Sequence, residues 1–202
     1  MITLSSHTVD ELLLPEKAVV LDVGSRNYGF AGAVLALRPL ATVICVEPDP
    51  DCPPPTDPRM QLVRKAMVGS RRQTAPYCTY STGEGNYLAD KDWFHPNPGT
   101  LIDVPCITFR ELMDELDVHW FDCVKLDCEG CEYEILENWP VPPVAAQISI
   151  EFHDFITRTR HDAAYYSRLW AHLHHYHVRQ HELITLGGIA SSTGHWDTLL
   201  SL

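Results

Sequence analysis

The sequence is short of basic residues and has no long apolar run. Its 202 residues contain 15 Lys and Arg against 27 Asp and Glu, for a net charge of −12. Because a nucleic acid is repelled by such a field, we expect no nucleic-acid partner. The longest uncharged apolar stretch covers residues 30–37 and is too short to cross a bilayer, so we expect no membrane partner.

We expect no export segment, because residues 1–20 lack a basic stretch followed by a long apolar core. We therefore expect a cytoplasmic protein. The seven cysteines are an odd number without the spacing of a disulfide scaffold, which favours reduced thiols. Cys123, Cys128 and Cys131 match a plant-type iron–sulfur spacing, but Cys123 falls within an apolar strand pattern. We interpret these cysteines as small buried side chains.

Apolar runs and helical patterns alternate along the chain. Residues 18–22 and 41–47 are continuous apolar runs typical of buried parallel strands, and residues 30–37 between them have a helical pattern. Strand, helix and strand form a βαβ unit, so the sequence predicts one α/β domain over residues 1–202 with a mostly parallel sheet. Further strands are expected at 60–67, 122–127, 145–153, 178–186 and 196–202, and further helices at 8–14, 108–116, 132–138 and 162–177.

Residues 70–107 interrupt this alternation. Two β-like stretches, 74–81 and 101–107, predict an inserted hairpin that forms a lid region. Upstream, residues 49–58 contain five prolines, which exclude a helix between the second and third strands. Aromatic and imidazole side chains in the insertion could close over a substrate or pack on the domain. These are Tyr80, Trp93 and His95.

The clearest binding motif follows the first predicted strand. In open α/β sheets, ligands bind beyond the carboxyl ends of the strands, and Asp22-Val-Gly24-Ser25-Arg26 lies there. Glu47 ends the second strand, where a carboxylate can accept hydrogen bonds from ribose hydroxyls. Arg26 stands where a dinucleotide-binding turn has its second glycine, which disfavours a pyrophosphate. These features predict a nucleoside cosubstrate without phosphates, such as S-adenosylmethionine.

Charged residues also occur near the ends of two buried strands. Lys125 and Asp127 share one face of their strand, and Glu151 and His153 share one face of the next. Buried charges are costly unless they are paired. If the two strands are neighbours in register, Lys125 lies near Glu151 and Asp127 near His153. The pattern therefore predicts a carboxylate–imidazole pair at the carboxyl edge of the sheet.

Five segments together resemble the FkbM family of S-adenosylmethionine-dependent methyltransferases: VVLDVGSRNYGF, VICVEPDP, ITFRELMDEL, VKLDCEGCEYEIL and ISIEFH. The most specific of them carries K-x-D-x-E-G-x-E at residues 125–132. The resemblance implies a class I methyltransferase fold, which is a Rossmann-like three-layer sandwich. Its seven-stranded sheet would have the order 3-2-1-4-5-7-6 and an antiparallel last strand. It also implies methyl transfer, usually to a hydroxyl of a sugar or a small natural product.

The resemblance assigns the cofactor contacts to three segments. The first turn would line the methionine part, the end of the second strand would hold the ribose, and the segment after the third strand would lie beside the adenine. The first turn is one residue longer than the family's usual D-x-G-A-N-x-G. The cofactor residues expected on this basis are Asp22, Gly24, Ser25, Arg26, Glu47, Ala66 and Met67.

Methyl transfer to a hydroxyl requires that the acceptor oxygen is held near the methyl carbon and that its proton is removed. Our leading hypothesis is that His153 is the base and that Asp127 orients it. Lys125 and Glu151 would then be a supporting pair. The alternative is that Asp127 acts alone as the base.

Other interpretations of these residues remain open. Asp127, Glu151 and His153 could bind Mg²⁺ or another divalent ion that activates the hydroxyl. They could instead form a purely structural cluster of buried charges. The chain could also be a catalytically inactive interaction module that binds S-adenosylmethionine. For the enzyme we expect a small-molecule or glycan acceptor, whose identity the sequence does not determine.

Overall fold

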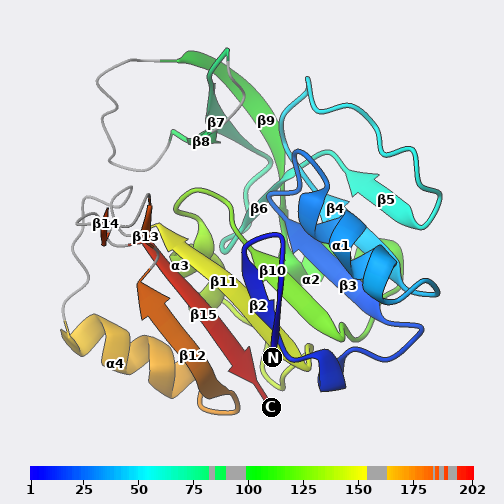
Figure 1. Ribbon diagram of the computed structural model, residues 1–202. Coiled ribbons are helices and arrows are strands. Elements are labelled where there is room, and N and C mark those ends of the chain that lie inside the picture. Colours follow the sequence, from blue (N-terminus) through cyan, green and yellow to red (C-terminus); the bar gives the residue numbers. More distant parts are fainter. Residues whose placement is uncertain (82–84, 90–98, 154–162, 184, 187–188, 191–194) are drawn as a thin grey trace.

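The computed structural model describes residues 1–81, 85–89, 99–153, 163–183, 185–186, 189–190 and 195–202 (Figure 1). Trp93 and His95 of the predicted insertion lie outside these residues. Among the described residues, no helix combines the length and the apolar character needed to cross a bilayer.

The domain is built on one seven-stranded sheet. Its order agrees with the predicted 3-2-1-4-5-7-6 when the strands are numbered along the chain. The strand β15 is antiparallel to both of its neighbours, β11 and β12, and the other pairs are parallel. From one edge to the other the strands are β12 (His177–Leu183), β15 (His195–Ser201), β11 (Gln147–His153), β10 (Cys123–Leu126), β3 (Val19–Val23), β4 (Thr42–Val46) and β5 (Met60–Val63).

Two apolar cores, one on each face of this sheet, make the predicted three-layer sandwich. On one face α1 (Gly29–Leu37) buries Phe30 and Val34 against Val20 of β3. On the other face the core contains buried side chains from three helices and from Leu21 and Val124 of the sheet. Those helices are α2 (Phe109–Leu116), α3 (Glu132–Glu137) and α4 (Ala163–His172). The helices predicted at 30–37, 108–116, 132–138 and 162–177 are thus present, although α4 ends earlier than expected.

The start of α2 shows how local sequence sets a boundary. The Thr108 hydroxyl accepts a hydrogen bond from the Glu111 backbone N–H, and the Glu111 carboxylate accepts one from the Thr108 N–H. This capping box satisfies N–H groups that the helix itself leaves unpaired. Phe109 and Leu112 are buried on the face that follows.

A second, four-stranded sheet occupies the region of the predicted insertion. Its order is β6 (Ala66–Val68), β9 (Thr100–Thr108), β7 (Thr74–Thr79) and β8 (Tyr87–Leu88). The single strand predicted at 60–67 was wrong, because the chain leaves the main sheet after Val63 and joins β9 through β6. At the break, the Arg64 guanidinium donates to the carbonyls of Asp49 and Cys52 in the proline-rich loop. The side chain therefore turns toward that loop.

The N-terminal segment forms a hairpin, not the helix predicted at 8–14. β1 (Ile2–Leu4) and β2 (His7–Val9) pair through a turn at Ser5 and Ser6, which both have positive φ. Only one turn of 3-10 helix follows, η1 (Glu11–Leu13). β2 lies beside β11 and β15, where Thr8 donates to the Asp197 carboxylate. Val9 and Leu14 are buried, whereas Leu12 is exposed. A further small pair, β13 (Thr185–Leu186) and β14 (Ile189–Ala190), precedes β15.

Candidate functional site

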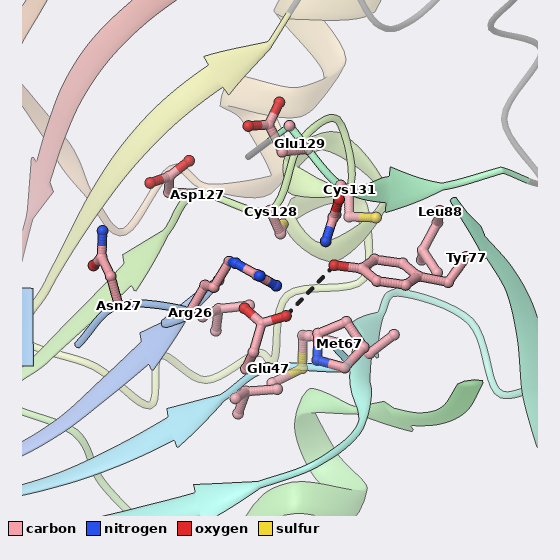
Figure 2. Close-up of a pocket in the computed structure, with 17 residues that line it drawn as sticks. Arg26, Asn27, Glu47, Met67, Tyr77, Leu88, Asp127, Cys128, Glu129 and Cys131 are labelled. Carbon is pink, nitrogen blue, oxygen red and sulfur yellow. Dashed lines mark hydrogen bonds between the residues drawn. The ribbon is translucent and has the colours of Figure 1, made fainter. Parts of the chain in front are cut away.

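A cavity of about 320 Å³ lies at the carboxyl ends of β3, β4 and β10 (Figure 2). The second sheet contributes its opposite wall through Tyr77 of β7 and Leu88 of β8. Clefts of this size are typical of small-molecule sites, and this edge of a parallel sheet is where they usually form. The sheet therefore places the cavity where the sequence predicts a cofactor.

The turn after β3 forms the floor of the cavity. Gly24 has φ +78°, and a Cβ added there would come within 1.8 Å of the Asp127 carbonyl oxygen. Only glycine permits both this backbone conformation and this close approach. Beneath the turn, the buried Lys125 ammonium donates to the carbonyls of Val23 and Gly24 at 3.1 and 2.8 Å. Lys125 thus joins the ends of β3 and β10.

Glu47 presents a carboxylate to the cavity from the end of β4. It is only 4% exposed, and burial raises its pKa to about 7, although Arg26, Lys125 and Tyr77 oppose the shift. The Tyr77 hydroxyl donates to Glu47 at 3.4 Å, and the backbone N–H of Asp49 donates to it at 3.0 Å. Figure 2 shows Arg26, Glu47 and Tyr77 pointing toward one another in the cavity. The carboxylate is therefore fixed in place.

Polar contacts join the second sheet to the first turn. Arg26 forms an ion pair with Asp49, and the buried Asn86 donates from its side-chain amide to the same carboxylate at 2.8 Å. The Asn86 carbonyl oxygen in turn accepts from the backbone N–H of Tyr80. Asn86 and Arg26 both line the cavity, so this chain of contacts closes it on one side.

The remaining wall is largely apolar. Ala66 and Met67 of β6 line it together with Tyr77 and Leu88. Such surfaces suit the flat, apolar faces of a purine ring. Two free thiols, Cys128 and Cys131, line it as well; all seven cysteines are free, as predicted.

At the other end of the cavity, Asp127 belongs to a cluster of charged residues. Its Oδ2 lies 3.3 Å from Lys125 Nζ and 3.3 Å from Nε2 of His7, which comes from β2. Burial on its own would raise the pKa of Asp127, but Lys125, His7 and His153 hold it well below its usual range. Asp127 is therefore ionised, and its second oxygen, Oδ1, faces His153 at 3.7 Å.

His153 is 2% exposed and lies among four carboxylates. Its Nδ1 donates to Glu132 at 3.0 Å, and its Nε2 lies 3.6 Å from Glu129 and 3.8 Å from Glu151. Burial would lower the pKa of His153, but Glu132, Glu129 and Asp127 together raise it to about 10. The imidazole is thus protonated near neutral pH in the absence of any other cation.

Two further carboxylates of the cluster have raised pKa values. Burial raises the pKa of Glu129 to about 7, helped by Asp127 and Glu132 and opposed by His153. Burial and Asp127 also raise the pKa of Glu151. Glu129 lines the cavity together with Asp127, and its backbone has φ +55° in the loop after β10.

The structure brings most of the predicted cofactor residues to the cavity. Gly24, Arg26, Glu47, Ala66 and Met67 line it. Asp22 and Ser25 are buried and are not among the lining residues. Asp22 instead forms an ion pair with Lys125 at 3.1 Å and supports the turn after β3 from below.

The predicted pairing of Lys125 with Glu151 was wrong. In the sheet Lys125 is level with Ser149 on β11 and with Asp22 on β3. The two strands are therefore offset by two residues from the expected register. Lys125 forms its ion pairs with Asp22 of the neighbouring β3 and with Asp127 just after its own strand. The predicted proximity of Asp127 and His153 was confirmed at 3.7 Å.

Several residues of the site were missed from the sequence. Tyr77 and Asn86 reach the cavity from the second sheet, and His7 reaches Asp127 from the N-terminal hairpin. No local pattern marks these three residues. Glu132 could have been found from the sequence, because it is the last residue of the K-x-D-x-E-G-x-E segment and directly follows the loop that it supports. Its carboxylate accepts hydrogen bonds from the backbone N–H groups of Cys128 and Gly130.

These groups fit S-adenosylmethionine. Glu47 offers a fixed acceptor for two ribose hydroxyls, Met67 and Leu88 offer apolar contact to adenine, and the Gly24 backbone lines the part of the cavity left for the methionine part. Asp127 and Glu129 place negative charge at the end of the cavity where a positively charged sulfonium or ammonium group would lie.

Comparison with known proteins bears this out. The sequence pattern of the Methyltransferase FkbM domain matches residues 22–200. Among curated proteins, none matches the chain. The fold is similar to that of the fibrillarin pre-rRNA processing protein of Methanococcus jannaschii, with a TM-score of 0.50 and 9% identity over 96% of this chain and 70% of that one.

A second solved structure is the precorrin-6Y C5,15-methyltransferase of Geobacter metallireducens GS-15. It covers 95% of this chain and 85% of its own, with 11% identity and a TM-score of 0.46. At 9% identity, the likeness to the fibrillarin protein bears on the fold alone. The match over residues 22–200 takes in the cofactor turn, the K-x-D-x-E-G-x-E segment and the last strands of the sheet. The chain therefore belongs to the FkbM family of S-adenosylmethionine-dependent methyltransferases and has the class I methyltransferase fold.

Proposed function

We propose that the protein transfers the methyl group of S-adenosylmethionine to a hydroxyl of a sugar or small natural product. The observation that carries this proposal is the continuity of the cavity, which runs from Glu47 and Met67 to Asp127 and Glu129. One end suits a nucleoside, and the other is rich in groups that can hold a hydroxyl and accept its proton. The net charge of −12 argues for a small acceptor and against a nucleic acid.

The residues at the nucleoside end bind and orient the cofactor. Glu47 accepts from the ribose hydroxyls, and Met67 and Leu88 pack on the adenine. Asn86 and Arg26 close the cavity beside them through Asp49. Bound S-adenosylmethionine supplies a methyl carbon activated by a sulfonium. The second sheet covers this end of the cavity through Tyr77 and Leu88.

The acceptor oxygen forms its bond to the methyl carbon as the sulfur–carbon bond breaks, so the cofactor leaves as neutral S-adenosylhomocysteine. The hydroxyl proton leaves to the charged cluster. Asp127 lines the cavity, whereas His153 is buried behind it. We therefore assign the contact with the acceptor hydroxyl to Asp127. His153 is a positioning residue in this scheme, which favours the alternative hypothesis from the sequence over the leading one.

Calorimetric binding of S-adenosylhomocysteine tests the cofactor half of the proposal. We expect saturable binding, which Glu47→Gln should weaken by about tenfold or more because one ribose acceptor becomes a donor. The exposed carboxylate variant Glu115→Gln is the matched control and should bind as tightly as the wild type. Absence of binding by the wild type would refute the cofactor assignment.

Transfer of a labelled methyl group to a panel of sugars and hydroxylated natural products tests the other half. Asp127→Asn should lower turnover by about a hundredfold or more while S-adenosylhomocysteine still binds. His153→Ala should also lose turnover, since Asp127 is no longer positioned. Cofactor binding without methylation of any hydroxyl would instead favour the inactive interaction module.

A further inference from the structure

We propose that Asp127, Glu129 and His153 form a binding site for a divalent cation at the acceptor end of the cavity. One ligand atom from each of the three residues lies within 4.8 Å of the other two. The inference concerns a site next to the one described above. Its catalytic meaning rests on the proposed function, but the binding of the ion does not.

The first argument is the spacing of the ligand atoms. His153 Nε2 lies 3.7 Å from Asp127 Oδ1 and 3.6 Å from Glu129 Oε2. These separations exceed those of N–H···O hydrogen bonds, which are about 2.7–3.2 Å. Adjacent ligands of one ion with bonds of about 2.1 Å are about 3.0 Å apart, so small side-chain rotations would close the atoms around a cation.

The second argument is the orientation of the imidazole. His153 Nδ1 donates to the fully buried Glu132 at 3.0 Å, which turns Nε2 toward the two carboxylates that line the cavity. A histidine that ligates a metal almost always donates its other ring N–H to a carboxylate or carbonyl in this way. Glu132 also holds the backbone N–H groups of Cys128 and Gly130, so the loop that carries Glu129 is fixed by the same group.

The third argument separates the two oxygens of Asp127. Oδ2 faces Lys125 and His7, each at 3.3 Å, so positive charge already lies on that side. Oδ1 faces His153 Nε2 at 3.7 Å. Ligand atoms of His7, Asp127 and Glu151 also lie within 4.8 Å of one another. We prefer the Oδ1 side, because Lys125 would repel a cation at Oδ2.

The charges nearby support the same conclusion. His153 lies within 3.8 Å of four carboxylates, those of Asp127, Glu129, Glu132 and Glu151. A divalent cation would offset this excess of negative charge. Two carboxylate oxygens and one imidazole form a mixed donor set that suits Mn²⁺ or Zn²⁺.

Such an ion would refine the role of Asp127. The acceptor hydroxyl oxygen would bind the ion at a position open to the cavity instead of contacting Asp127 directly, and its proton would pass to Glu151. The methyl group would still move from sulfur to oxygen, and the ion would undergo no redox change.

Binding of Mn²⁺ to chelator-treated protein, measured by calorimetry and electron paramagnetic resonance, tests the site. We expect one ion per chain, and we expect His153→Gln and Glu129→Gln each to weaken binding by about tenfold or more. Glu115→Gln and the double variant His172→Gln/His175→Gln are controls that should leave the affinity unchanged. Circular dichroism checks that each variant is folded. If only one of His153→Gln and Glu129→Gln folds, the affinity of that variant alone tests the site.

Three outcomes would overturn the proposal. The first is no saturable binding below about 1 mM, and the second is an affinity in both His153→Gln and Glu129→Gln that equals that of the wild type. The third is loss of binding only in His7→Gln, which would place the ion on the Oδ2 side. S-adenosylhomocysteine binding by the metal-free wild type is measured in parallel. If that binding persists without any ion site, the cation proposal fails and the proposed function stands. If it is absent, the proposed function fails whatever the ion does.

Discussion

At the scale of single residues, the site depends on charges that are buried in defined surroundings. Glu47 has an ordinary sequence context at the end of β4, yet its pKa rises to about 7 because the carboxylate is buried. Arg26, Lys125 and Tyr77 limit the rise, and Asp22 adds to it. The folded protein therefore favours the protonated form of Glu47 more than the unfolded chain does, so this group's contribution to stability falls as pH rises from about 4.5 to about 7.

The same shift predicts a pH dependence of cofactor binding. Only the ionised carboxylate can accept hydrogen bonds from both ribose hydroxyls, and it is lost as pH falls through about 7. The affinity for S-adenosylhomocysteine should therefore fall by about tenfold between about pH 8 and pH 6. Calorimetric titrations across this interval measure the effect. Glu47→Gln should flatten the profile, and an unchanged slope in that variant would assign the titration to another group.

At the scale of elements, the loop between β10 and α3 is the critical connection. It contains Asp127 and Glu129, and Glu129 has φ +55°, a conformation that non-glycine residues adopt rarely. Glu132 compensates by accepting hydrogen bonds from Cys128, Gly130 and His153 while fully buried. One carboxylate at the start of α3 thus fixes the loop and the imidazole together.

Replacing this carboxylate by an amide should therefore be costly. In Glu132→Gln an N–H would face backbone N–H donors, so we expect the free energy of unfolding to fall by about 2–4 kcal/mol. Urea denaturation measures the loss. The control Glu115→Gln breaks only a partly exposed ion pair with Lys65 and should cost less than about 1 kcal/mol. Equal losses in the two variants would contradict the role given to Glu132.

At the scale of the whole molecule, the two sheets share one core. Ala75, Tyr77 and Leu88 of the second sheet are buried in the same cluster as Leu21 and Val124 of the main sheet. The inserted region is thus part of the domain and forms a wall of its cavity. The sequence predicts an inserted hairpin that forms a lid region, whereas the structure has a more extensive four-stranded sheet there.

A shared core predicts a single cooperative unfolding transition. Ile107→Ala in β9 removes a side chain that is 2% exposed, and we expect it to lower stability by about 2–5 kcal/mol. Differential scanning calorimetry should show one transition at a lower temperature, with equal calorimetric and van't Hoff enthalpies. Leu101→Ala on the same strand removes an exposed side chain and should have little effect. Two separate transitions would show that the sheets unfold independently.

The sequence by itself determined the features that depend on local pattern. Continuous apolar runs identified the parallel strands, a helical pattern identified the helix over residues 108–116, and Gly24 with Glu47 marked the edge of the sheet where the cavity lies. In each case the physical cause acts within one element or one turn, so the residues that carry it are close in sequence.

Only the tertiary structure decided which distant residues meet. The register of β10 with β3 places Lys125 level with Asp22, and its register with β11 places Lys125 level with Ser149 and not with Glu151. The second sheet brought Tyr77 to Glu47, and the N-terminal hairpin brought His7 to Asp127. A shift of two residues leaves every side chain on its own face of the sheet, so alternation alone cannot distinguish the registers. Packing across elements selected one of them and thereby the partners of each buried charge.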